Sequence, residues 1–222
     1  AAIATLAAIA GYGWASEPIR DAASVAVAVA ASAALLLSIT HRTTGSTPRS
    51  NEDEQRTLSF DPRWDLLAPT VGIIGLVAAG ISGGGNEVLQ TARILVGAAF
   101  LGSVTDAMLL GHWYLVQPGL RREPLLEQVS WLGKLWPLEV GLLIVPTGMI
   151  SVLTGKIDDS YGGMLGWFWL ACALTTGGLV IVTRAALRER QYAAVMAATG
   201  LLYLAILTAF GTDVVARLVL ET

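Results

Sequence analysis

Long apolar stretches separated by short polar connections constrain this chain more than any other feature of its sequence. A helix needs about 20 consecutive apolar residues to cross a bilayer, and the usual range is about 17–25. Lipid cannot satisfy exposed strand edges, and the alternating pattern of a membrane β-barrel is absent. The sequence therefore predicts an all-α, polytopic integral membrane helix bundle, with about seven transmembrane helices in one transmembrane domain, 1–222. The predicted spans are residues 1–15, 22–40, 66–82, 92–116, 138–154, 163–183 and 193–212.

The composition supports a membrane protein independently of any single stretch. Of 222 residues, 54% are hydrophobic and 14% are charged, and the mean hydropathy is +0.62. Soluble domains carry about 25% charged residues. The net charge of −3 and the lack of a basic run give no support for a nucleic-acid partner, and none is expected. The single cysteine, Cys172, lies in an apolar stretch, so the sequence predicts no disulfide and no cysteine-based metal or iron–sulfur site.

The distribution of lysine and arginine over the connections predicts the orientation of the chain. Of 14 basic residues, four fall on one side of the membrane, namely Arg20, Arg93, Lys156 and Arg217, and the others fall on the opposite side. Cytoplasmic connections carry the excess of Lys and Arg. We therefore expect a multi-pass protein of the cell (plasma or inner) membrane, with its N-terminus in the cytoplasm and its C-terminus outside.

The stretch 92–116 carries the most unusual polar residues, Asp106 near its middle and His112 near its end. Ionisable side chains within a span are rare, and they usually face protein or water. Small residues that let helices approach closely recur at every fourth position of the same stretch. These small residues are Ala99, Ser103, Ala107 and Gly111. The pattern predicts a central helix that is surrounded by protein.

Two interpretations of Asp106 stay open. As a functional group it would carry a proton or form a charge pair within the membrane. As a structural group it would stay protonated, or bond to a neighbouring helix, and only hold the bundle together. His112 lies six residues further on, so the two side chains should have separate partners. We expect His112 to meet Glu139 at the start of the next span, and Asp106 to face a different helix.

Aromatic and basic residues gather at the predicted cytoplasmic side. With one carboxylate they form a candidate site for a quinone head or an anionic lipid headgroup. The candidate residues are His112, Trp113, Tyr114, Arg121, Arg122 and Glu139. The alternative is an ordinary aromatic belt with arginines that extend to the interface. No cofactor is predicted beyond a bound lipid or quinone. His41 and His112 lie at a similar predicted depth, as two axial haem ligands would, but nothing else in the sequence supports haem binding. We therefore expect no haem and no metal.

The connections and the ends of the predicted spans suggest further features. The polar connection 41–65 is expected to be a flexible cytoplasmic loop. Residues 124–135 place apolar side chains on one helical face, which predicts an amphipathic helix lying on the cytoplasmic membrane surface or, equally, on a partner subunit. Pro137 would then begin the fifth span, with Glu139 in its first turn and a kink at Pro146. Near the outer end, Asp213 and Arg217 form an i, i+4 pair.

No sequence motif indicates catalysis, since neither G-x-S-x-G nor H-E-x-x-H is present. We therefore expect a non-catalytic integral subunit of a larger membrane complex, with the lipid bilayer and other membrane subunits as partners. A respiratory or other electron-transfer assembly is the expected kind. The alternative is a small proton- or ion-coupled transporter or channel that uses Asp106. A membrane-embedded lipid enzyme is the third hypothesis.

Overall fold

The computed structural model describes six continuous segments of the chain. These are residues 67–82, 86–117, 121–145, 148–159, 161–189 and 191–220, together with single positions at Ala22, Val25, Ala26 and Val29. All regular elements among them are α-helices, as the sequence predicts. The predicted span 1–15, the connection 41–65 with His41, and the span 22–40 apart from those four positions lie outside the described residues.

The helices follow the predicted apolar stretches except in one region. Their bounds are α3 Leu67–Ser82, α4 Glu87–Val116, α5 Glu123–Ile144, α6 Gly148–Leu153, α7 Met164–Arg188 and α8 Tyr192–Leu220. Three of them, α4, α7 and α8, are long and apolar enough to cross a membrane. The chain is therefore a helical membrane protein, whereas the total of seven spans remains a prediction.

The chain divides into two compact units, Ala1–Ile94 and Leu95–Thr222. In the first unit, α3 leads into the first turns of α4, and Gly80 of α3 lies directly against Thr91 of α4. A Cβ atom at Gly80 would overlap the backbone of Thr91, so this close approach requires glycine.

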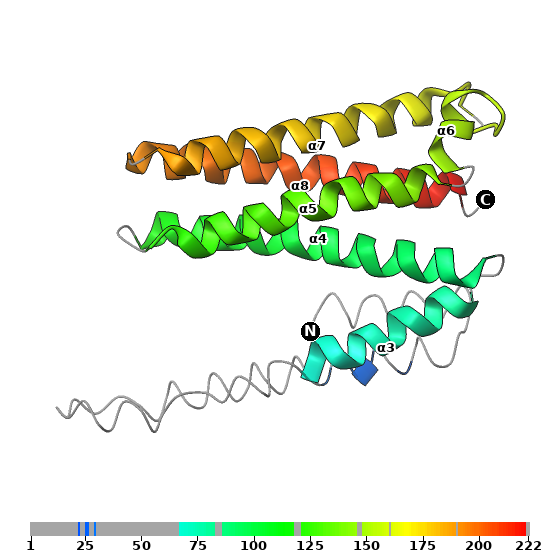
Figure 1. The fold of residues 1–222 in the computed structure, drawn as a ribbon, viewed down its shortest axis with the longest axis horizontal. Helices are drawn as coiled ribbons and strands as arrows, with labels where there is room; N and C mark the ends of the chain where they lie inside the picture. Colours follow the sequence, from blue (N-terminus) through cyan, green and yellow to red (C-terminus); the bar gives the residue numbers. More distant parts are fainter. Residues whose placement is uncertain are drawn as a thin grey trace. The chain divides into compact units, whose positions relative to one another are not determined.

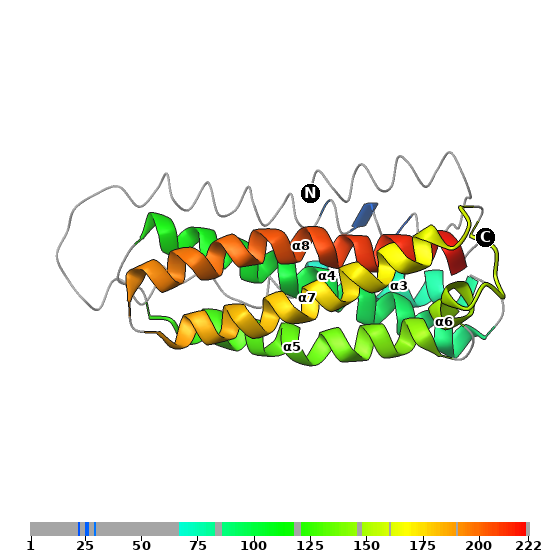
Figure 2. The ribbon, with the colours of Figure 1, turned by 90° about the horizontal axis from the view of Figure 1, so that it is seen from above.

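The second unit is a bundle in which α4, α5, α7 and α8 run side by side, each antiparallel to the one before it (Figures 1 and 2). Side-chain contacts link α4 to α5, α5 to α7, and α7 to α8. Between α7 and α8, the hydroxyl groups of Thr176 and Thr208 lie 2.7 Å apart. Between α8 and α4, Thr199 lies against Gly111, where a Cβ would be 3.0 Å from its hydroxyl oxygen. The four helices thus close into a ring around a shared core.

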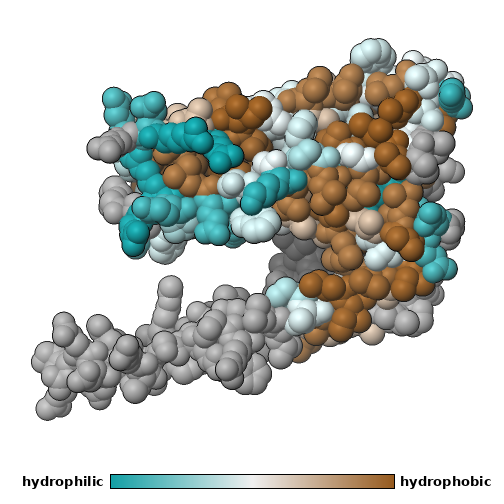
Figure 3. Space-filling view, viewed as in Figure 1, coloured by the Kyte–Doolittle hydropathy of each residue, from teal (hydrophilic) through white to brown (hydrophobic). Residues whose placement is uncertain are grey.

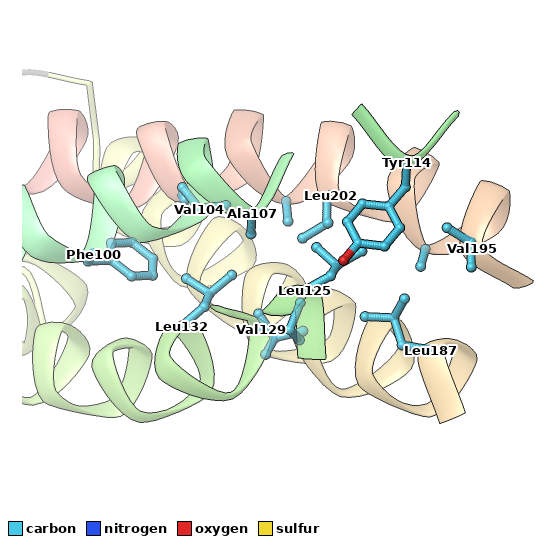
Figure 4. Close-up of a cluster of buried hydrophobic side chains, with 14 residues drawn as sticks. Phe100, Val104, Ala107, Tyr114, Leu125, Val129, Leu132, Leu187, Val195 and Leu202 are labelled. Carbon is cyan, nitrogen blue, oxygen red and sulfur yellow. The ribbon is translucent and has the colours of Figure 1, made fainter. Parts of the chain in front are cut away.

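Two apolar clusters fill this ring. The larger cluster contains residues from all four long helices, as Figure 4 shows for its ten labelled members. Its most buried members include Phe100, Val104, Leu125, Leu132 and Leu202. The smaller cluster lies where α6 packs on α7 and α8, and it contains Leu143, Met149, Val152, Trp169, Val215, Ala216 and Val219.

The region of α5 differs most from the prediction. One continuous helix runs from Glu123 to Ile144, with Pro137 inside it, in place of a surface helix over 124–135 and a span over 138–154. The predicted apolar face is real, but its residues Leu125, Val129 and Leu132 are fully buried in the core of the bundle. The buried face continues to Leu143. The free energy gained by burying it outweighs the loss of the one backbone hydrogen bond that an internal proline removes.

The end of α5 and the small-residue face of α4 also correct the prediction. Instead of kinking at Pro146, α5 ends at Ile144, and Val145 is extended, as the residue before a proline prefers. On α4, Ala107 and Gly111 are buried, whereas Ala99 is exposed. Ser103 is half-buried, so burial of the predicted small-residue face increases from Ala99 toward Gly111.

The closest approach between α5 and α7 gives a test of this packing. A Cβ at Gly177 would lie 2.7 Å from the ring of Trp136, whereas a Cβ at Gly178 would meet nothing within 4 Å. We predict that Gly177→Ala lowers the free energy of unfolding by about 1–3 kcal/mol, because a rigid ring and a helix backbone have to shift. Gly178→Ala, the matched control, should change it by no more than about 0.5 kcal/mol.

Unfolding by SDS in mixed micelles measures both variants. Equal effects of the two substitutions would contradict the close α5–α7 contact.

Candidate functional site

Asp106 lies on the surface of the four-helix unit and not in its interior. Its side chain is exposed, and the amide of Gln128 in α5 donates a hydrogen bond to its carboxylate. Within the four-helix unit the described residues do not enclose Asp106, and the expectation that α4 is surrounded by protein stays a prediction. Helical geometry explains the outcome, because the buried face of α4 runs through Val104, Ala107 and Gly111, and Asp106 points away from it.

His112 is also exposed, and it meets α8 instead of α5. Its Nδ1 atom lies 3.1 Å from the hydroxyl of Tyr203, and the two rings meet edge to face. Asp106 and His112 thus have separate partners, as expected, but Asp106 meets α5 and His112 meets α8, whereas His112 was expected to meet the start of the fifth span. Gly97, which lies near Glu139, is fifteen residues before His112 on α4, so Glu139 is about 22 Å from His112 along the bundle.

Part of the predicted quinone or lipid group does come together at one end of the unit. The buried Tyr114 donates a hydrogen bond to the carbonyl of Arg121, and Arg122 donates one to the carbonyl of Glu189. Trp113 is exposed beside them on α4. Hydrophilic residues gather over this end, and hydrophobic residues predominate over the other half (Figure 3). Arginine and aromatic side chains therefore lie together there, without Glu139.

Glu139 belongs instead to a group of charged side chains inside the bundle, which we call the buried charge cluster: Glu139, Asp213 and Arg217. Glu139 is fully buried, Asp213 is 4% exposed, and the side chain of Arg217 is 28% exposed, so the cluster is buried at its two carboxylates and reaches the surface at Arg217. The guanidinium of Arg217 pairs with Asp213, with 2.8 Å between Nη2 and Oδ1. The sequence indicated this i, i+4 pair, but it did not indicate that the pair faces inward.

The backbone of Gly97 brings the cluster together. A Cβ there would overlap Arg217 Nη2, and it would lie 2.7 Å from Asp213 Oδ1 and 3.4 Å from Glu139 Oε1. The Glu139 carboxylate therefore lies within about 6 Å of the Arg217 guanidinium, the range in which one charge affects the protonation of another. A pattern in the sequence could have located the cluster, because Asp213 shares a helix face with the small residues Ala209 and Ala216. In the structure both alanines are fully buried.

The opposite face of α5 carries charges that point outward. Glu127, Trp131, Lys134 and Leu138 are all exposed. They recur at intervals of four, three and four residues, which places them on one side of a helix. We call these four residues the outer stripe of α5. The ammonium group of Lys134 lies 4.3 Å from the ring centre of Trp131, a favourable cation–π distance.

Asp159, in the connection before α7, is buried and is held by backbone groups. Its carboxylate accepts hydrogen bonds from the backbone N–H groups of Tyr161, Gly163 and Leu165. These bonds, led by the one from Gly163, hold the pKa of Asp159 below its usual range. Within the part of the chain that the structure describes, no group of three metal-ligating side chains is found.

The chain matches no protein-family model, no curated protein and no solved structure. The chemistry of the site therefore has to be argued from its own geometry. That geometry separates two features: polar groups on the outside of α4 and α5, suited to contact with another polar surface, and the buried charge cluster inside the bundle, suited to holding or moving a proton.

Proposed function

We propose that this chain is a non-catalytic integral subunit of a larger membrane assembly. The observation that carries the proposal is the exposed Asp106 on α4, with Gln128 of α5 bonded to it. Asp106 lies ten residues, or about 15 Å, inside the nearer end of a helix that is apolar enough to cross a membrane. A charged side chain at the bilayer centre costs roughly 2.5–3.5 kcal/mol, and polar groups of a partner subunit would reduce that cost.

The kind of assembly and the lipid contact also belong to the proposal. An electron-transfer complex remains the kind that we propose, and the identity of a co-purifying subunit decides it. At the arginine-bearing end, the exposed Trp113 and Arg121 would contact lipid headgroups or a quinone. This end carries Arg121, Arg122, Arg184 and Arg188, which supports its placement in the cytoplasm.

Purification of the tagged full-length chain in mild detergent tests the proposal. The wild-type chain should run in a complex larger than its own 23.3 kDa and carry a second polypeptide. Asp106→Leu should lower the amount of that polypeptide by about tenfold, equivalent to about 1.4 kcal/mol, because the carboxylate is lost. Asp106→Asn should retain it, since the amide oxygen still accepts the bond from Gln128.

Thr175→Leu, on the exposed side of α7, is the control and should leave the complex intact. A wild-type chain that purifies alone from native membranes would contradict the subunit proposal.

A second candidate, a proton- or ion-coupled transporter, is favoured by one specific observation. The buried charge cluster lies between the two apolar clusters of the bundle, next to helices that are apolar enough to span a membrane. Ionisable residues that face the interior of such a bundle mark proton or ion pathways more often than they serve packing alone. The transported proton would bind at Glu139, and Asp106 would play no part in the transfer.

Proton flux into liposomes that contain the purified chain separates the two functions. For a transporter, Glu139→Gln should reduce the flux to that of empty liposomes, because an amide cannot release a proton at neutral pH. Glu127→Gln, on the exposed face of the same helix, is the matched control and should leave the flux unchanged. If wild-type and empty liposomes show the same flux, the transporter hypothesis is wrong and the cluster is structural.

A further inference from the structure

The outer stripe of α5 lies beside the middle of α7 along the length of the bundle, although it points away from α7. Trp136 packs on Gly177, and its indole N–H donates to the carbonyl of Ala173, 2.9 Å away. Both contacts lie near the centre of α7, which runs from Met164 to Arg188 and is long and apolar enough to cross a membrane. The backbone of Lys134 precedes Trp136 by two residues, so it lies within about 3 Å of the same depth, and its ammonium group reaches back over Trp131, toward the start of α5.

The charge of Lys134 is directed away from the bundle. Its side chain is exposed, and within the described segments its contact is with Trp131 on its own helix and not with a carboxylate. An aromatic face stabilises an ammonium group only partly. A helix that presents a cation to the outside at this depth is suited to a polar neighbour more than to lipid tails.

We propose that the outer stripe of α5 is the surface that docks onto a membrane helix of a different subunit, and that this helix carries a carboxylate at the depth of Lys134. The inference rests on the proposed role as a subunit of an assembly, and it names the surface and the chemistry of the partner. A carboxylate pairs with the ammonium group, and the flat ring of Trp131 and the side chain of Leu138 supply apolar contact on either side of that pair.

Charge excludes a second copy of this chain as the occupant. Two copies inserted in the same orientation and related by a twofold axis would bring each residue of the stripe close to its own counterpart. Lys134 would then face Lys134, and Glu127 would face Glu127. The two residues are seven positions apart, or about 10 Å along the helix, so a cross-pairing at equal depth is too long. A different polypeptide with the opposite charge fits the stripe better.

Photocrosslinking in native membranes tests the inference on the full-length chain. A benzophenone side chain replaces Leu138 in the stripe and, as a control at the same depth on α7, Leu174, which is 62% exposed. Position 138 should give an adduct with another membrane polypeptide, attached to a helix that carries Asp or Glu within about one turn of the crosslink. Position 174 should give lipid adducts only.

A charge exchange then tests the proposed ion pair. Lys134→Glu should reduce the adduct at position 138 about tenfold, and replacing the partner's carboxylate by lysine should restore it. Lys134→Gln should give an intermediate yield, and unchanged thermal stability of each variant in detergent excludes misfolding.

Three results would overturn the inference. These are an adduct with a second copy of this chain, lipid adducts alone at position 138, or an adduct that is insensitive to the charge exchange. If the complex that depends on Asp106 still purifies in any of these cases, the docking surface is wrong and the subunit role stands. If no complex purifies at all, the proposed function has failed first.

Discussion

The indole ring of Trp136 in α5 packs directly against the backbone of α7 at Gly177. There is no room for a Cβ at Gly177, and the indole N–H of Trp136 bonds to the carbonyl of Ala173 in the preceding turn of α7. This contact draws α5 into the bundle beside α7 along its full length. Once α5 is fixed in this way, its helical period determines which of its charged side chains face inward and which face outward.

That division of charges organises the functional hypotheses. On the inner face, Glu139 joins the ion pair of Asp213 and Arg217 between two apolar clusters. On the outside, Asp106 is exposed on α4, which is apolar enough to cross a bilayer. Lys134 is exposed on α5, which packs beside the equally apolar α7. Buried charges of the first kind suit proton transfer or a structural ion network, and exposed charges of the second kind suit contact with another subunit. On α5 the two kinds of charge are separated, because Glu139 is buried and Lys134 is exposed.

The sequence predicted the helices well wherever long apolar stretches set their positions. The apolar length of α4, α7 and α8 was visible, and α3 follows the predicted span 66–82 closely. The course of α5 was not visible in the sequence, because Pro137 resembles a helix start and Lys134 breaks the apolar run. The separate partners of Asp106 and His112 followed from helical geometry, but their identity did not. Which helices are neighbours depends on contacts such as that at Gly177, and hydropathy does not encode them.

A nitroxide scan along α5 in a lipid bilayer tests whether one helix crosses the bundle from Glu123 to Ile144. For one continuous helix, the mobility and the oxygen accessibility of the nitroxide should oscillate with a single period of about 3.6 residues across Pro137. Minima should fall at Val129, Leu132 and Glu139, and maxima should fall on the outer stripe. A break in phase at Pro137, with residues 124–136 showing the uniform depth of a helix lying on the membrane surface, would contradict one continuous helix.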